Sequence, residues 1–134
     1  MPLRVYYEDT DAAGIVYYAN YLKFAERART DMLCALGYQH ARMAKEQGLA
    51  FAVRHCAADY RRPALLEDRL EVDVTVTKAG GATLEVRQVV SRDGEALVVM
   101  DVRLACIDRR GRPARIPKVL RDILSEQQLA GGRD

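Results

Sequence analysis

The stretch from Tyr7 to Tyr21 places three acidic side chains and Gly14 directly before a helical pattern that begins at about Tyr17. The first N–H groups of a helix lack intrahelical acceptors and lie at the positive end of its dipole, so they can bind an oxyanion. A carbonyl held there would be polarised, and Asp9 or Asp11 could activate water or attack its carbon. The stretch therefore predicts acyl transfer without Ser, Cys or metal.

A purely structural role is the competing interpretation of the same residues. Asp and Thr before a helix commonly act as caps, and an Asp-x-Asp cluster often only keeps a loop solvated. Spacing by itself therefore leaves both a cap and a catalytic carboxylate open.

The run from Val5 to Asp11, with the residues that follow to Tyr21, resembles the signature of the 4-hydroxybenzoyl-CoA thioesterase family, whose members have the hotdog fold. Val5 to Asp11 is especially similar to the branch associated with the Tol-Pal cell-envelope system. The resemblance extends with decreasing specificity from about Leu3 to Leu124. It implies an acyl-CoA thioesterase that releases a carboxylic acid and free CoA, and no cofactor, because CoA is part of the substrate.

The same resemblance implies roles for individual residues. In that family the second aspartate of the Asp-x-Asp pair is the catalytic carboxylate, here Asp11, and the oxyanion donor is a backbone N–H at the start of the central helix, here that of Tyr18. The Tol-Pal branch often has histidine at the position of Tyr18, whereas the hydroxybenzoyl branch has tyrosine, so substrate preference stays open. Family members hold CoA along the segment that contains Lys78, Gly80 and Gly81, the expected substrate-binding residues.

Hydrophobic periodicity predicts the helices that must position these groups. Apolar residues recur on one helical face from about Tyr17 to Leu36, and Gly37 is a suitable stop. A shorter helix is predicted from His40 to Glu46, ending at Gly48. Before the motif, Val5 and Tyr7 resemble the end of a short strand, and a proline-initiated helix is expected from Pro117 to about Gln127.

From Leu49 onward the hydrophobic period changes to two, which predicts strands. The four runs are 50–61, 69–78, 82–92 and 95–107. Turn signals at 79–81 and 93–94 join the last three runs into an antiparallel meander, and the last run, apolar on nearly both faces, should be central or at an interface. The pattern gives an α+β domain, and with the resemblance it predicts the hotdog fold, a curled antiparallel sheet of about five strands around one long helix.

Length and composition indicate one domain spanning residues 1–134, with residues 130–134 as a disordered tail. The net charge of +2 is too small to indicate nucleic-acid binding. No apolar run approaches the roughly 18 residues of a membrane span, so the expected location is the cytoplasm. His40 and His55 are not grouped with other metal ligands, and no metal is expected.

The three cysteines are interpreted as reduced, small core residues. The resemblance further implies a homo-oligomer, a tetramer built from dimers, because family members form a continuous sheet across two protomers and hold each site between them. An acyl carrier protein is a candidate partner. Two other functions stay open: a domain that binds acyl-CoA or acyl carrier protein without turnover, which would not need Asp11, and a hydratase or dehydratase, which typically uses a His that the motif lacks.

Overall fold

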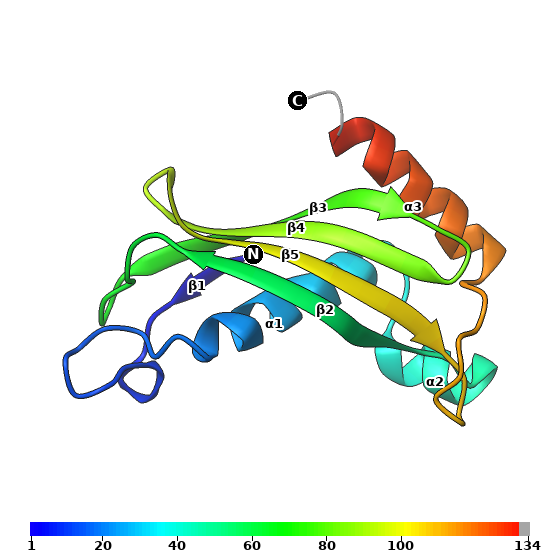
Figure 1. Cartoon of the computed structure of the whole chain (residues 1–134), viewed down its shortest axis with the longest axis horizontal. Helices are drawn as coiled ribbons and strands as arrows, with labels where there is room; N and C mark the ends of the chain where they lie inside the picture. The colour runs from blue at the N-terminus through cyan, green and yellow to red at the C-terminus, as the bar shows by residue number, and fades with distance from the viewer. Residues whose placement is uncertain (132–134) are drawn as a thin grey trace.

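The computed structural model describes residues 1–131. Its elements in chain order are β1 (Pro2–Arg4), the 3-10 turn η1 (Tyr7–Asp9), α1 (Asn20–Ala35), α2 (His40–Gln47), β2 (Ala50–Tyr60), β3 (Arg69–Ala79), β4 (Thr83–Arg92), β5 (Glu95–Ile107) and α3 (Lys118–Gly131). The strands form one five-stranded antiparallel sheet in the order β1-β3-β4-β5-β2. In Figure 1 the sheet curls around α1, and α3 packs against β3. The predicted fold is confirmed.

β3 and β4 match the alternation in the sequence, because one face of each strand is buried on the side of α1. On β4, Leu84, Val86 and Val90 are buried beneath the helix, whereas Arg87 points to the outer face. β5 lies between β4 and β2, which is the central position that its nearly continuous apolar run predicted. The meander of β3, β4 and β5 is likewise confirmed.

A polar contact ties the helix to the sheet. Gln88 of β4 is the only polar or charged side chain in the described part of the chain that is fully buried. Its side chain donates to the Ala25 carbonyl (2.8 Å) and accepts from Arg29 Nη1 (2.9 Å). Burial lowers the pKa of Arg29 without removing its charge. Because both ends of the amide are satisfied, Gln88 fixes the rotation of α1 over the sheet.

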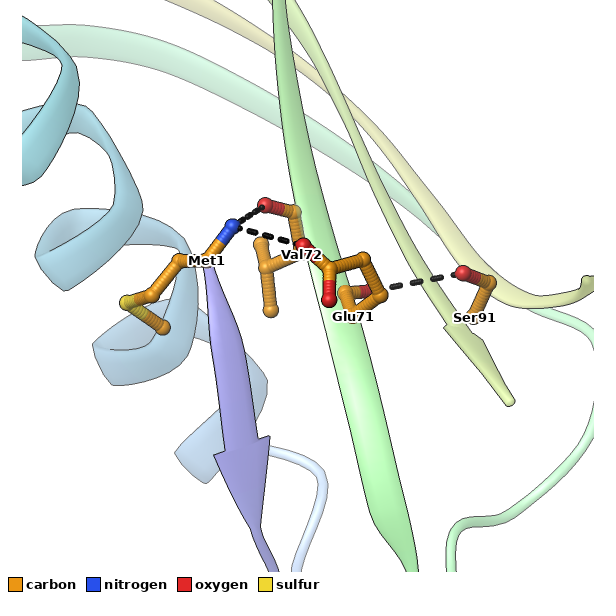
Figure 2. Close-up of polar contacts among 4 residues, drawn as sticks. All are labelled: Met1, Glu71, Val72 and Ser91. Carbon is orange, nitrogen blue, oxygen red and sulfur yellow. Dashed lines mark hydrogen bonds and ion pairs between the residues drawn. The ribbon is translucent and has the colours of Figure 1, made fainter. Parts of the chain in front are cut away.

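The first strand is shorter than expected. β1 ends at Arg4, because the Tyr6 N–H donates to Asp9 Oδ2 (2.9 Å) and turns the chain into η1. At the other end of β1, the Met1 amino group donates to Glu71 Oε1 and to the Val72 carbonyl, both at 2.9 Å (Figure 2). These contacts hold the strand against β3.

The last helix is longer than expected. α3 starts at Lys118, directly after Pro117, but it extends to Gly131, past the predicted end at Gln127 and into the segment expected to be disordered. Its buried Leu124 anchors it, and Gln128 Oε1 accepts from the Ala79 N–H (3.0 Å). The remainder of the predicted tail, 132–134, lies outside the described residues.

The prediction that all three cysteines are core residues is wrong for two of them. Cys106 is buried, but Cys34 and Cys56 are exposed. Cys56 lies on β2, the edge strand, where α1 does not cover the concave face, and Cys34 lies on the solvent side of the last turns of α1.

Candidate active site

The loop before α1 folds back on itself through backbone hydrogen bonds. Asp11 N–H donates to the Ile15 carbonyl (2.9 Å), and Tyr17 N–H donates to the Asp9 carbonyl (3.0 Å). Gly14 permits the reversal, because its φ of +78° is in the left-handed region that glycine tolerates best. The two arms of the loop therefore place Asp9 beside Tyr17, close to the helix start, and Asp11 opposite Ile15, two positions nearer the tip of the loop.

The Asp11 carboxylate is oriented but only partly engaged. Its Oδ1 accepts from the Ala13 N–H at 2.8 Å, and within residues 1–131 its Oδ2 has no hydrogen-bond partner. The side chain is exposed. Asp11 therefore presents one open carboxylate oxygen, which a base or a nucleophile needs.

Asp9, two residues earlier, is hydrogen-bonded through one carboxylate oxygen and through its backbone carbonyl. Its Oδ2 accepts from the Tyr6 N–H, and its carbonyl accepts from both the Tyr17 N–H and Asn20 Nδ2 (2.9 Å). These contacts close η1 and tie it to the first turn of α1. Each aspartate therefore keeps one carboxylate oxygen without a hydrogen-bond partner in residues 1–131, but Asp9 is half-buried whereas Asp11 is exposed.

The helix starts later than predicted, after one tight turn. The α-helical span begins at Asn20, and the preceding turn has Asn20 N–H donating to the Tyr17 carbonyl (2.9 Å) and Tyr21 N–H donating to the Tyr18 carbonyl (3.3 Å). In the described part of the chain, the N–H groups of Tyr18 and Ala19 have no backbone acceptor. They are free donors at the positive end of α1.

An open pocket of about 300 Å³ lies beside these donors. It is lined by Ile15, Val16, Tyr18, Tyr21, Tyr60, Arg61, Arg62 and Pro63. The Tyr60 ring centroid lies 6.1 Å from that of Tyr18 and 5.7 Å from that of Tyr21. Burial raises the pKa of both Tyr21 and Tyr60, so both phenols are neutral at physiological pH. Sequence analysis missed Tyr60, because a single aromatic residue at a strand end carries no distinguishing pattern.

The predicted substrate-binding residues lie at the opposite end of the sheet. β3 begins at Arg69, close to the Asp11 loop, and Lys78 lies at its other end, roughly 30 Å along the strand (Figure 1). Gly80 and Gly81 form the turn that follows. A single chain therefore does not bring these three residues to Asp11.

The two glycines of that turn differ in what they contact. Gly80 N–H donates to the Thr83 carbonyl (2.8 Å), and a Cβ at Gly80 would lie 2.9 Å from Thr83 Oγ1. A Cβ at Gly81 would meet open space, although the Gly81 carbonyl accepts from the Ile116 N–H (2.8 Å). Hairpin packing alone explains Gly80, whereas Gly81 leaves its surroundings open to a ligand.

The outer face of the sheet carries a separate set of charges. Arg87 donates to Asp101 through two bonds, at 2.9 and 3.1 Å, and Arg103 Nε donates to Glu85 Oε1 at 3.1 Å. The hydrogen bond from Arg87 lowers the pKa of Asp101. His55 lies on this face too, away from Asp11.

Residues 1–131 contain no cluster of three or more His, Cys, Asp or Glu side chains that could hold a metal ion. None of the helices in the same range has the length and apolar character needed to cross a bilayer.

The fold and the loop geometry agree with the comparison to known families. A sequence model of the thioesterase-like superfamily matches residues 5–124. The chain belongs to this family, and the recognition made from the motif is confirmed.

Individual relatives cover most of the chain. The acyl-CoA thioesterase YbgC of Haemophilus influenzae is 44% identical over 118 residues, which are 87% of each protein. A 1,4-dihydroxy-2-naphthoyl-CoA hydrolase of Synechococcus elongatus is 29% identical, again over 87% of each. The crystal structure of a probable thioesterase from Bartonella henselae superposes with a TM-score of 0.83 at 34% identity, covering 87% of this chain and 97% of that one.

Proposed function

We propose that this protein, an acyl-CoA thioesterase, hydrolyses its substrate to a carboxylic acid and free CoA with Asp11 as the reacting carboxylate and the Tyr18 N–H as the oxyanion donor. One observation carries the assignment. Asp11 has an oriented carboxylate with a free oxygen, on the same loop that leads to the unpaired N–H groups of Tyr18 and Ala19. Its neighbour Asp9 also keeps one carboxylate oxygen free, but Asp9 is half-buried and its carbonyl is held by Tyr17 and Asn20.

In the proposed reaction the thioester carbonyl oxygen accepts a hydrogen bond from the Tyr18 N–H. The helix dipole and this donor stabilise the negative charge that develops on the oxygen. Asp11 then either removes a proton from the attacking water or attacks the carbonyl carbon itself, giving a mixed anhydride that water hydrolyses. Both routes break the carbon–sulfur bond and release a thiolate whose conjugate acid has a pKa of about 8.5, so the leaving group needs no strong acid.

A second copy of the chain would complete the site. β2 is an eleven-residue edge strand whose concave side exposes Val53 and Tyr60, and such an edge is a template for pairing. Antiparallel pairing of β2 with the same strand of a second copy, about a two-fold axis, reverses the direction of the second sheet. The second copy's Lys78 and Gly81 would then lie at the Asp11 end of the first.

A tetramer built from two such dimers has support on the outer face. Glu85 is paired across strands with Arg103, and Arg87 with Asp101. The sign of the charge therefore alternates both along each strand and between the two strands. A two-fold axis in the plane of that face, parallel to the strands, would set Glu85 over Arg103 and Arg87 over Asp101 of the other copy. The pattern is therefore complementary to itself.

The expected cellular setting belongs to the same proposal. The exposed Cys34 and Cys56 are free, which fits a reducing compartment and hence the cytoplasm. Association with the Tol-Pal system rests on the similarity of Val5 to Asp11 to that branch of the family. An acyl carrier protein is a candidate alternative donor because it also presents its acyl group as a thioester.

Thiol release from short-chain, long-chain and aromatic acyl-CoA esters, and from an acyl carrier protein ester, tests the function. We expect turnover of at least one CoA ester with one free thiol and one carboxylic acid formed per ester consumed. Tight binding of these esters without thiol release would instead identify a binding module.

A further inference from the structure

Tyr60 ends β2 with its ring on the concave face of the sheet, beside the first turn of α1. Its ring is nearly perpendicular to that of Tyr18, at 82°. Behind it, Tyr21 is buried, and the Tyr21 hydroxyl is fixed because it accepts from the Ala64 N–H at 2.9 Å. Tyr60 itself is 45% exposed, so one side of its ring faces open space.

On one side of this ring lies the pocket of about 300 Å³. Ile15, Val16 and Pro63 give it apolar walls, and the charges of Arg61 and Arg62 at its edge are paired with Asp59 and Glu95. The volume is at the lower end of the range for small-molecule sites, so it suits an acyl or aryl group better than a whole CoA ester. Tyr18 both lines this pocket and carries the proposed carbonyl donor.

On the other side of the ring, the concave face of β2 continues without cover. In register with β5, Tyr60, Ala58 and Cys56 pair with residues that are buried on the concave side, so all three share that face. Ala58 is half-buried, Cys56 is exposed, and Val53 further along is 50% exposed. This strip of small and apolar side chains could hold a longer hydrocarbon chain, but Tyr60 stands between it and the pocket.

We infer that Tyr60 determines acyl specificity: its ring closes the pocket against the β2 strip and limits the substrate to a short acyl chain or a single aromatic ring. This inference rests on the proposed acyl-CoA hydrolysis. An aromatic acyl group can pack edge-to-face against Tyr18 and Tyr60, and a short chain ends before the ring. A longer chain has to displace the ring, which is held between Tyr18 and the buried Tyr21.

The test is the dependence of kcat/KM on acyl length. Wild type and Tyr60→Ala are assayed for thiol release with a saturated series from acetyl-CoA to palmitoyl-CoA, below micellar concentrations, and with benzoyl-CoA. In wild type we expect kcat/KM to fall once the chain outgrows the pocket. In Tyr60→Ala, kcat/KM for the first chains beyond that limit should rise at least about tenfold, the smallest effect expected for a methylene that begins to fit an apolar pocket.

Three further variants make the outcome decisive. Tyr60→Phe keeps the ring and should keep the wild-type profile, and so should Tyr7→Ala, which removes a ring that is 82% exposed on η1 and does not line the pocket. If circular dichroism shows that Tyr60→Ala is unfolded, Tyr60→Leu provides the same test with a smaller apolar side chain.

The possible failures can be told apart. An active Tyr60→Ala or Tyr60→Leu with the wild-type chain-length profile would overturn the role of Tyr60 and leave the proposed hydrolysis intact. Absence of thiol release from every ester by the wild type would overturn the proposed hydrolysis, and this inference with it.

Discussion

The two ends of the sheet hold their loops in different ways. At the Asp11 end, the loop is closed by its own backbone bonds and by Asp9, which leaves a carboxylate oxygen of Asp11 and the Tyr18 N–H free. At the other end, the turn after Lys78 is closed by contacts from the C-terminal segment, where Ile116 N–H donates to the Gly81 carbonyl and Gln128 accepts from Ala79 N–H.

This difference leads us to expect that the chemical step and the recognition of CoA depend on opposite ends of the sheet. At the Lys78 end, the Ala79 and Gly80 N–H groups and the Gly81 and Ala82 carbonyls are hydrogen-bonded within the fold, whereas the Lys78 ammonium is exposed and the space around Gly81 is open. The Asp11 end keeps one carboxylate oxygen of Asp11 and the Tyr18 N–H unpaired. We therefore expect changes at the Asp11 end to act on turnover, and changes at the Lys78 end to act on substrate binding.

The largest effect should follow Asp11→Asn. The substitution keeps the shape of the side chain and an oxygen for the Ala13 N–H but removes the charge, so turnover should fall by about 10² to 10⁴ while substrate binding is largely kept. Steady-state thiol release measures both. Asp9→Asn is the matched control and should lose less, because an Asn oxygen can still accept from the Tyr6 N–H. Near wild-type turnover in Asp11→Asn would reject the mechanism.

A smaller effect, on KM, should follow Lys78→Ala. If this ammonium meets a CoA phosphate, its loss should raise KM by about tenfold, the value of one charge-assisted hydrogen bond, with kcat little changed. Raising the ionic strength should narrow the difference between wild type and variant, since salt screens the charge. A lower kcat at unchanged KM would contradict the proposed placement of CoA.

Mixing the two variants tests whether the ends meet across two copies. In a mixed dimer of Asp11→Asn and Lys78→Ala chains, a site shared between copies would have either both changes or neither. After random exchange, half of the dimers are mixed, and about a quarter of all sites should be wild type. Activity at low substrate concentration that stays at the mean of the two separate variants would show that each site lies within one chain.

The smallest effects should distinguish the two glycines. Gly80→Ala should lower the free energy of unfolding by about 1 kcal/mol, because the new methyl group crowds Thr83. Gly81→Ala should change it by less than about 0.5 kcal/mol, since its Cβ meets open space, yet it should raise KM if CoA passes close to that backbone. Urea unfolding and steady-state kinetics on both variants make the comparison. Equal destabilisation by the two changes would contradict it.

Much of the fold is readable from local pattern. The strands from Ala50 to Ile107 lie close to the runs predicted from the sequence, and α2 is followed by Gly48, whose φ of +66° is left-handed. The predicted start of α1 was less accurate: the helix begins at Asn20, whereas the sequence predicted a start at about Tyr17. No side chain caps this helix, so the sequence gives no boundary signal there, and a tight turn precedes it.

The sequence by itself determined the class of the protein and its reactive segment, because strand alternation, the long amphipathic helix and the motif from Val5 to Asp11 are all local. Only the tertiary structure decided that Asp11 is more exposed than Asp9, that Tyr60 lines the pocket, and that Lys78 lies at the far end of the sheet from Asp11. These properties depend on hydrogen-bond partners and neighbours that folding brings together. A residue type and its spacing along the chain do not specify them.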